Sequence, residues 1–237
     1  MALAHSPKIV TDGLLRCLDI GNNKSYPGSG STITDLSSSK DNGTNNGASY
    51  NSADPKNFSF SADDYISGTT FYNSRDAGSV EAWFQHNQST HSQLGMIYKE
   101  GLANGFGGEK EMHLSVDPNG VLNIFFESSA GDLSLSQSGS IPANTWTCAT
   151  ATFTGLTSNR SAKIYVNGSL NSSASASGTY NGTNPSNNSY IGRSAQTIGG
   201  AYRGLVGKIA IVRCYDRQLS DTEVLQNYTA LKGRFGL

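Results

Sequence analysis

The chain has 237 residues, with 17 Lys or Arg against 18 Asp or Glu, and its net charge at pH 7 is −1. This balance provides neither the basic surface of a nucleic-acid-binding protein nor a polybasic segment for a membrane. No apolar run approaches the roughly 18 residues that a membrane-spanning helix needs. Charged residues make up only 15% and Gly numbers 27, which suits many strands joined by tight turns. We expect one undivided all-β domain over residues 1–237.

The two ends of the chain carry matching strand patterns. Apolar residues dominate 13–19 and again 207–216. Because unpaired edge strands invite aggregation, we expect these two segments to lie in one sheet and to shield each other. Met1–Lys8 has no long apolar core after a basic flank, so it does not resemble a signal peptide and is interpreted as an N-terminal extension.

Two polar tracts, 22–57 and 171–189, are rich in Ser, Asn and Gly. Each lies between runs that are predicted to be strands of the same core. We therefore interpret both tracts as long surface loops of one domain and not as linkers between domains.

Strand signals recur between these tracts. Ser79–Gln85 alternates apolar and polar residues with period two, which predicts a strand with one face on a core. Asn119-Gly120 and Asn167-Gly168 each separate two alternating runs and predict hairpins, since both residue types tolerate positive φ. Trp146–Phe153 is rich in β-branched residues and predicts a further strand.

The end of the chain predicts one short helix, at about 221–231. Ser220 and Glu223 have the spacing of a capping box. Four apolar residues then recur at helical spacing, and Gly233 supplies a stop signal. They are Val224, Leu225, Tyr228 and Leu231. Residues 232–237 are expected to form a C-terminal tail.

Candidate catalytic groups are few. Glu109 and Glu111 are the nearest acidic cluster, and they follow a Gly-rich stretch without a wider acidic motif. We interpret them as a solvated junction and expect no enzymatic activity. His86 and His91 lie five apart in a polar turn, with no Cys or carboxylate at zinc-ligand spacing.

The three cysteines are expected to be small buried hydrophobes, because free Cys packs in that way. They are Cys17, Cys148 and Cys214. A Cys17–Cys214 disulfide between neighbouring terminal strands is the alternative in an oxidising compartment.

Fragments spread along the chain resemble the concanavalin A-like lectin/glucanase superfamily, in its laminin-G-like branch. The resemblance runs from about Ile9 to Leu237 and depends on the order and spacing of its fragments. They are Asp12–Leu14, Asp19–Asn22, Thr34–Ser37, Asn42–Thr44, Phe58–Phe60, Asp63–Ile66, Trp146, Lys163–Gly168, Tyr190–Arg193 and Tyr215–Ser220. The resemblance implies an all-β fold, a two-sheet antiparallel jelly-roll sandwich with the short helix packed on its edge.

Two further segments, Ser25–Gly30 and Asn227–Gly236, resemble lectin-like accessory proteins in the virions of tailed phages, especially phages of marine cyanobacteria. This resemblance implies a non-enzymatic decoration module of a capsid, tail or fibre, present in multiple copies. Its partners would be other virion proteins and cell-surface glycans, with no nucleic acid and no membrane insertion. The alternatives are a secreted or cell-surface carbohydrate-binding module and, less favoured, a glycoside hydrolase.

Calcium is the one metal that the sequence suggests. The loop 35–44 offers oxygens of the kind that calcium binds, from Asp35, Asp41 and Asn42. Related laminin-G-like sandwiches often hold a structural calcium near the matching loop, although Lys40 departs from their pattern. The other interpretation is a loop held by Asx-turns without a metal.

Sugar binding would need aromatic platforms at the loop tips. Seven aromatic residues lie in loop-like sequence, and each is expected to anchor its loop on the rim of the sandwich. They are Tyr26, Tyr50, Phe71, Tyr72, Phe106, Tyr180 and Tyr202.

Overall fold

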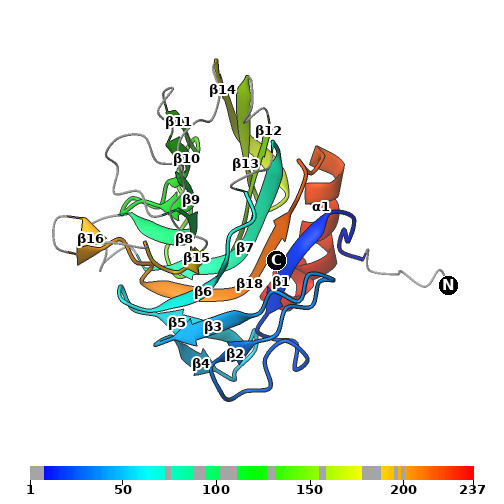
Figure 1. Ribbon diagram of the computed structural model, residues 1–237, viewed down its shortest axis with the longest axis vertical. Coiled ribbons are helices and arrows are strands. Elements are labelled where there is room, and N and C mark those ends of the chain that lie inside the picture. The colour runs from blue at the N-terminus through cyan, green and yellow to red at the C-terminus, as the bar shows by residue number, and fades with distance from the viewer. Residues whose placement is uncertain are drawn as a thin grey trace.

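The computed structural model describes residues 8–72, 76–87, 94–101, 111–127, 132–154, 159–177, 188–194, 197–198 and 201–237. Within them, two antiparallel eight-stranded sheets pack face to face, and one helix lies on the outside (Figure 1). The predicted all-β sandwich with one C-terminal helix is therefore confirmed. None of the helices in these ranges is long and apolar enough to cross a membrane.

The first sheet, sheet A, carries the helix. Its order is β14 (Ser169–Ala176), β13 (Arg160–Val166), β12 (Thr147–Thr154), β7 (Gly78–His86), β18 (Gly207–Tyr215), β5 (Asn57–Phe60) and β4 (Ser49–Asn51), with β1 (Leu14–Asp19) also paired to β18.

The second sheet, sheet B, has the order β11 (Leu133–Ser136), β10 (Leu122–Glu127), β9 (Glu111–Val116), β8 (Gly95–Glu100), β15 (Asn188–Ile191), β6 (Tyr65–Thr69), β3 (Gly43–Asn46) and β2 (Thr32–Ile33). A separate small ribbon pairs β16 (Thr197–Ile198) with β17 (Ala201–Tyr202).

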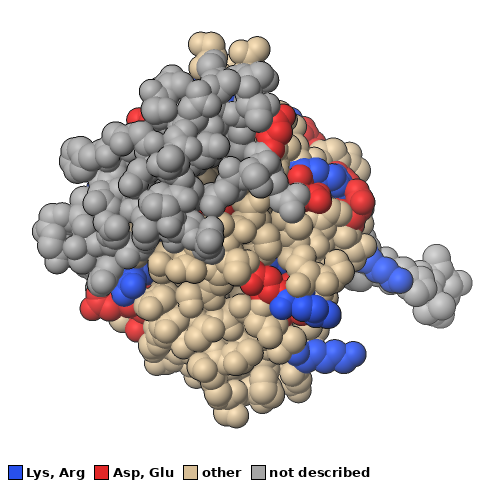
Figure 2. Space-filling model, in the orientation of Figure 1, with Lys and Arg blue, Asp and Glu red and all other residues tan. Residues whose placement is uncertain are grey.

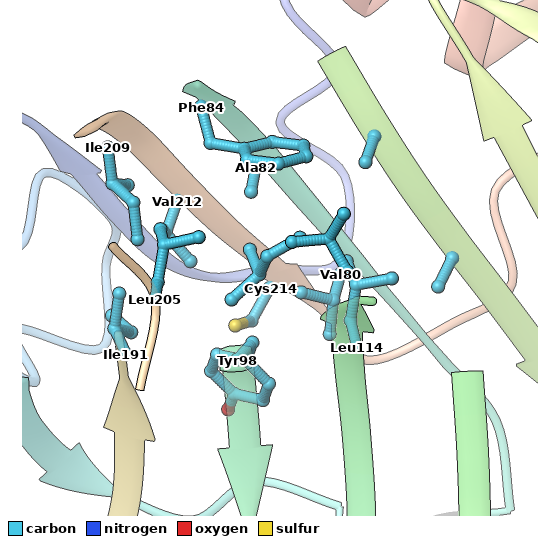
Figure 3. Packing of buried hydrophobic residues seen from close by; sticks show 14 of the residues in the cluster. Val80, Ala82, Phe84, Tyr98, Leu114, Ile191, Leu205, Ile209, Val212 and Cys214 are labelled. Atoms are coloured by element: carbon cyan, nitrogen blue, oxygen red, sulfur yellow. The ribbon is translucent and has the colours of Figure 1, made fainter. Parts of the chain in front are cut away.

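The core fills the space between the two sheets. Val80, Ala82 and Phe84 alternate along β7 and point from sheet A toward Tyr98 and Leu114 of sheet B, as Figure 3 shows. All five side chains are buried. Burial of apolar area on this scale is the main favourable contribution to folding.

The predicted pairing of the chain ends is confirmed. β1 runs antiparallel to β18, with Cys17 opposite Arg213 and Asp19 opposite Ile211. Both hairpins are confirmed too, since β9 pairs with β10 and β13 with β14. Asn167 and Gly168 have φ of 50° and 78°, the left-handed backbone that this two-residue turn requires.

The two polar tracts are more ordered than we predicted. The tract 22–57 contains β2, β3 and β4, and 171–176 continues β14. These strands are short or carry small polar side chains, so they lack the apolar alternation by which sequence reasoning finds a strand. Residues 178–187 of the second tract lie outside the described residues.

The helix α1 spans Asp221–Leu231, as predicted, and its capping box is present. Arg217 also bonds Glu223 through both guanidinium Nη atoms, and these bonds lower the pKa of Glu223 from 4.5 to about 2. The predicted apolar face is wrong at Leu225, which is 49% exposed, because Asn227 takes a buried position instead.

The C-terminal segment is not a free tail, contrary to our expectation. Residues Lys232–Phe235 form a 3-10 helix, η2, and the left-handed glycine that follows it is Gly236 and not Gly233. Phe235 is buried and stacks on Trp83, with ring centroids 4.1 Å apart. Tyr228 of α1 also stacks parallel to Trp83, at 5.7 Å. The helix therefore packs on the outer face of sheet A and not on its edge.

This packing buries both faces of β7. Glu81 and Trp83, on the face of β7 opposite Val80, Ala82 and Phe84, are each fully buried. Glu81 Oε1 pairs with Arg213 Nη1 at 2.5 Å, and its Oε2 accepts a hydrogen bond from Asn227 Nδ2 at 2.8 Å. The amide oxygen of Asn227 accepts the main-chain N–H of Val10 at 2.7 Å. One buried polar network therefore joins β7, β18, α1 and the N-terminal segment.

All three cysteines are buried and free, as the leading interpretation predicted. Burial raises the pKa of Cys214 to about 12, so this thiol stays protonated at neutral pH.

We predict that Glu81→Ala lowers the free energy of unfolding by about 3–5 kcal/mol, because it leaves the Arg213 guanidinium buried without its partner. Urea unfolding measures the loss. Lys163→Ala is the control, since it breaks an ion pair with Asp221 that is partly exposed, and it should cost less than about 1 kcal/mol. Equal losses in the two variants would contradict the importance of the buried pair.

Candidate functional site

The outer face of sheet B carries one continuous row of side chains. Successive strand pairings set these residues directly opposite one another, and directly opposite residues share a face. Their neighbours along each strand, such as Leu114 and Ile124, point into the core. The row consists of Thr32, Thr44, Ser67, Tyr190, Lys99, His113, Phe125 and Ser134.

Aromatic rings line this face at two places. His113 stacks on Phe125, with centroids 5.3 Å apart and planes inclined by 27°. Tyr65, on the same face of β6, lies 5.8 Å from Tyr190, and the guanidinium of Arg193 sits 4.0 Å from the centre of the Tyr65 ring. Phe125, Tyr190 and Tyr65 are half-buried, which leaves part of each ring accessible.

Cationic and hydroxyl groups lie between the rings. Lys99 is central in the row and only 1% exposed, and His113 beside it is 4% exposed. Ser67 and Thr44 add hydroxyls farther along. Since Lys99 and His113 are buried, the half-buried rings and the hydroxyls are the groups that a ligand can reach. Ring faces with hydroxyls at fixed positions form the kind of surface that holds a sugar, because rings cover its C–H groups and polar groups meet its hydroxyls.

The strand register also brings two glutamates together that sequence reasoning did not connect. Glu111 of β9 lies directly opposite Glu127 of β10. The two residues are 16 apart in the sequence and so did not look like a pair, although the Asn119-Gly120 hairpin predicted that β9 and β10 are neighbours. Glu109, the other acidic candidate, lies outside the described residues.

The two histidines of the described ranges, His86 and His113, have different surroundings. His86 is buried and its Nε2 lies 3.2 Å from the carbonyl oxygen of Ile141, and burial lowers its pKa. His113 belongs to the row on sheet B. His5 and His91 lie outside the described residues.

The structure brings the three predicted calcium residues together around Asp35. Its Oδ1 accepts the main-chain N–H groups of Cys17 and Ser37, at 2.8 and 2.9 Å. Its Oδ2 accepts the Ser37 hydroxyl at 2.6 Å and the Asp41 N–H at 3.0 Å. The Asp35 carboxylate is fully buried. The bond from the Ser37 N–H to Asp35 Oδ1 forms an Asx-turn.

The other two candidates are engaged in the same way. Asn42 Oδ1 accepts the N–H of Asp35 at 2.9 Å. Asp41 Oδ2 forms an ion pair with the buried guanidinium of Arg16, which also donates to Ser189 Oγ at 2.7 Å and lies over Phe71. Through Arg16 the loop is attached to sheet B.

These residues do not fit a calcium ion as they are arranged. Calcium needs roughly six to eight oxygens that face it, whereas here Asp35, Asp41 and Asn42 direct their oxygens at N–H, O–H and guanidinium donors. In the described ranges no group of three or more His, Cys, Asp or Glu could hold a metal ion. The Asx-turn interpretation explains the hydrogen bonds of this loop, and addition of calcium to the protein tests the other interpretation.

The loop aromatics that the structure describes are anchors, as expected. Tyr26 is buried and packs edge-on against Tyr50 and Phe58, at 5.1 and 4.8 Å. Tyr72 is buried and donates to the carbonyl of Ser79 at 2.7 Å. Phe106 and Tyr180 lie outside the described residues, and only the backbone of Tyr202 is described.

Comparison with known families supports the relationship that the sequence suggested. A family model described as the concanavalin A-like lectin/glucanases superfamily, Laminin_G_3, matches residues 60–225. The chain belongs to this superfamily. No curated protein matches the chain in sequence.

Solved structures share the fold of this laminin-G-like chain at low identity. The receptor-binding domain of botulinum neurotoxin type G is 19% identical, with a TM-score of 0.64, and the match covers 92% of this chain and 51% of that one. The binding domain of botulinum neurotoxin DC in complex with rat synaptotagmin II is 18% identical, with a TM-score of 0.67 and coverage of 94% and 52%.

The same neurotoxin DC domain in complex with SialylT gives 17% identity, a TM-score of 0.63 and coverage of 94% and 52%. The laminin-G-like chain therefore spans about half the length of these structural relatives. At this identity, the likeness shows the fold alone.

We predict that calcium leaves the thermal midpoint of EDTA-treated protein unchanged, because the oxygens of Asp35, Asp41 and Asn42 already accept protein hydrogen bonds. Asp35→Asn, in contrast, should lower the free energy of unfolding by about 1–3 kcal/mol with or without calcium, since an amide cannot accept all four donors. Differential scanning calorimetry measures both effects. A calcium-dependent rise that Asp35→Asn abolishes would establish a metal at this loop.

Proposed function

We propose that this laminin-G-like chain is a non-enzymatic module of a tailed-phage virion that adheres to cell-surface glycans through the outer face of sheet B. The virion assignment is supported by the resemblance of Ser25–Gly30 and Asn227–Gly236 to phage accessory proteins. The glycan assignment is supported by the row on sheet B. The module is placed on the particle surface and in several copies, where repeated weak contacts bind far more tightly than one.

One observation carries the adhesive function, the composition of the row on sheet B. Phe125 and Tyr190 keep half-buried rings on either side of the buried Lys99 and His113, and no member of the row is a carboxylate. Rigid sheet positions hold these groups in place, which lowers the entropy lost when a sugar binds. Half-buried rings beside hydroxyl groups suit retention of a glycan without chemical change.

The charge distribution agrees with a partner that is neither nucleic acid nor membrane. On the face that Figure 2 shows, Lys, Arg, Asp and Glu side chains are scattered among larger uncharged areas. Among the described residues of this face there is no basic patch of the kind that backbone phosphates require, and the net charge of the chain is −1.

The neurotoxin binding domains support the use of this fold as a carrier of binding surfaces. One of those domains was solved with SialylT and with rat synaptotagmin II, so proteins that contain this fold bind partners of both kinds. Because this chain matches only about half of each, the support concerns the fold as a carrier of binding surfaces.

One observation favours a second candidate, glycoside hydrolysis. A retaining or inverting glycosidase needs two carboxyl groups across the scissile bond, and the register pairs Glu111 with Glu127. The third candidate, a secreted or cell-surface carbohydrate-binding module, would use the same row on sheet B and differs only in where the protein resides.

We predict that Tyr190→Ala and Phe125→Ala each weaken glycan binding about tenfold, the effect of losing one stacked ring. A glycan array identifies the ligand, and calorimetric titration measures the affinity. Leu225→Ala is the matched control, because this exposed side chain lies on α1, far from sheet B, and its loss should leave affinity unchanged. Binding that survives both ring substitutions would exclude this face.

The same preparation tests catalysis. We expect no release of reducing ends from β-glucans or algal polysaccharides above a blank. Activity that Glu111→Gln or Glu127→Gln abolishes would instead establish a hydrolase.

We predict that the protein copurifies with intact phage particles and decorates their surface in repeated copies when particles are labelled and imaged. We propose that the N-terminal extension contacts the particle, so removal of residues 2–7 should lower occupancy on the particle. A protein found only as a soluble monomer, or only on cells, would contradict the virion assignment and leave the glycan-binding face to be judged on its own assay.

A further inference from the structure

Part of the outer face of sheet A is left uncovered by α1 and η2. The helix packs over β7, β13 and β18, where it contacts Glu81, Tyr165 and Tyr215. Strands β5 and β4 continue the sheet away from it (Figure 1). Trp83 on this face is fully buried beneath Tyr228 and Phe235, and the next outward residue of β7, Gln85, is only half-buried. The cover therefore ends between these two positions of one strand.

A second straight row of side chains crosses this uncovered area. Ser49 lies opposite Ser59, Ser59 opposite Lys208, and Lys208 opposite Gln85. Trp146 directly precedes Thr147, the partner of Phe84, so it continues the row beside Gln85. Neighbouring strands lie about 4.8 Å apart, so five positions extend over about 19 Å. A chain of several sugar rings can lie along a row of this length.

The aromatic end of the row is held rigidly. The ring of Trp146 lies 5.0 Å from that of Phe235, which in turn stacks on Trp83. Arg234 fixes η2 from the other side, through an ion pair of 2.7 Å with Asp19. The 3-10 helix therefore forms a wall along the row, and Trp146 keeps part of its ring accessible beside that wall.

The polar groups of this row are available to a ligand. Ion pairs and side-chain hydrogen bonds occupy most charged groups nearby, such as Arg234 with Asp19 and Lys56 with Asn23. Within the described part of the chain, by contrast, the Lys208 ammonium has no carboxylate partner and the Gln85 amide has no hydrogen-bond partner. Both side chains are half-buried, which restricts how far either can turn from the row.

We propose that this row is a second glycan subsite, one that takes an acidic oligosaccharide built of uronic acids. Trp146 stacks on the C–H face of one sugar ring, and Gln85, Ser59 and Ser49 bond hydroxyls along the chain. Lys208 is the only charged member of the row, so charge complementarity selects a carboxylate for the sugar above it.

The subsite goes beyond the proposed function, because it lies on the other sheet from the first row and selects a different ligand charge. A module with a site on each outer face can hold two glycan chains at once. On a particle with many copies, this raises retention without any tighter single contact.

Titration of the isotopically labelled full-length protein with a short oligogalacturonate tests the proposal. Chemical shifts should change at the Trp146 indole N–H and the Gln85 side-chain amide. Lys208→Gln should weaken binding of this probe about tenfold or more, since a hydrogen bond between charged groups is lost, and Lys208→Arg should restore most of it. Raising the salt concentration should weaken the wild type and not the Lys208→Gln variant.

Two comparisons make the result decisive. A maltooligosaccharide of equal length serves as the neutral probe, and its affinity should not respond to Lys208→Gln. Tyr190→Ala should leave oligogalacturonate binding unchanged, whereas Trp146→Ala should abolish it, with the circular dichroism spectrum as a check on folding.

Three outcomes would overturn the subsite. The first is the absence of shifts at Trp146 and Gln85 with the acidic probe. The second is equal affinity of wild type and Lys208→Gln for that probe. The third is loss of binding in Tyr190→Ala alone, which would refute the subsite while supporting glycan binding on sheet B. Loss of particle association or of sheet B binding, with Trp146 and Lys208 still responsive, would refute the proposed function and not the subsite.

Discussion

The buried pair of Glu81 and Arg213 is the contact that holds α1, the last strand and the first residues together on sheet A. It lies on the outer face of sheet A, where a strand face would ordinarily meet water, and it is buried because α1 covers it. Asn227 completes the network by bonding both Glu81 and the main chain of Val10. A buried charge without its partners is costly, so the helix, the last strand and the first residues are tied to one another.

The position of α1 and η2 decides which outer side chains are buried and which are accessible to a ligand. Where α1 and η2 lie on sheet A, the outward side chains are core residues, and Trp83 is the largest of them. Where the cover stops, outward side chains of the same strands become a polar row that ends in Trp146. Among the described residues no helix covers the outer face of sheet B, and there the outward positions form the row that contains Phe125 and Tyr190. The binding surfaces that we propose are therefore the parts of the two outer faces that α1 and η2 do not cover.

The Asp35 loop illustrates how the same residues serve structure instead of chemistry. Carboxylate and amide oxygens in a short loop suit calcium, yet a main-chain N–H is an equally good partner for them. Asp35 accepts four donors, and Asp41 neutralises the buried Arg16. The loop is thereby joined to both sheets by hydrogen bonds and one ion pair. Residue types alone do not distinguish these two uses, because the difference lies in the direction of each oxygen.

The sequence by itself determined what depends on local pattern. Period-two alternation predicted β7 and β12, Asn-Gly turns predicted two hairpins, and the Ser220–Glu223 spacing predicted the start of α1, because each signal is contained within a few residues. Only the tertiary structure decided which outward faces are covered, since Glu81 and Trp83 look like solvent-facing residues until Asn227 and Phe235 pack on them. It also decided the two rows, whose members come from distant parts of the chain and meet only through strand register. Which strands become neighbours sets both the burial of a side chain and its partner on the next strand. Strand pairing depends on the free energy of the whole fold and not on that of any one segment.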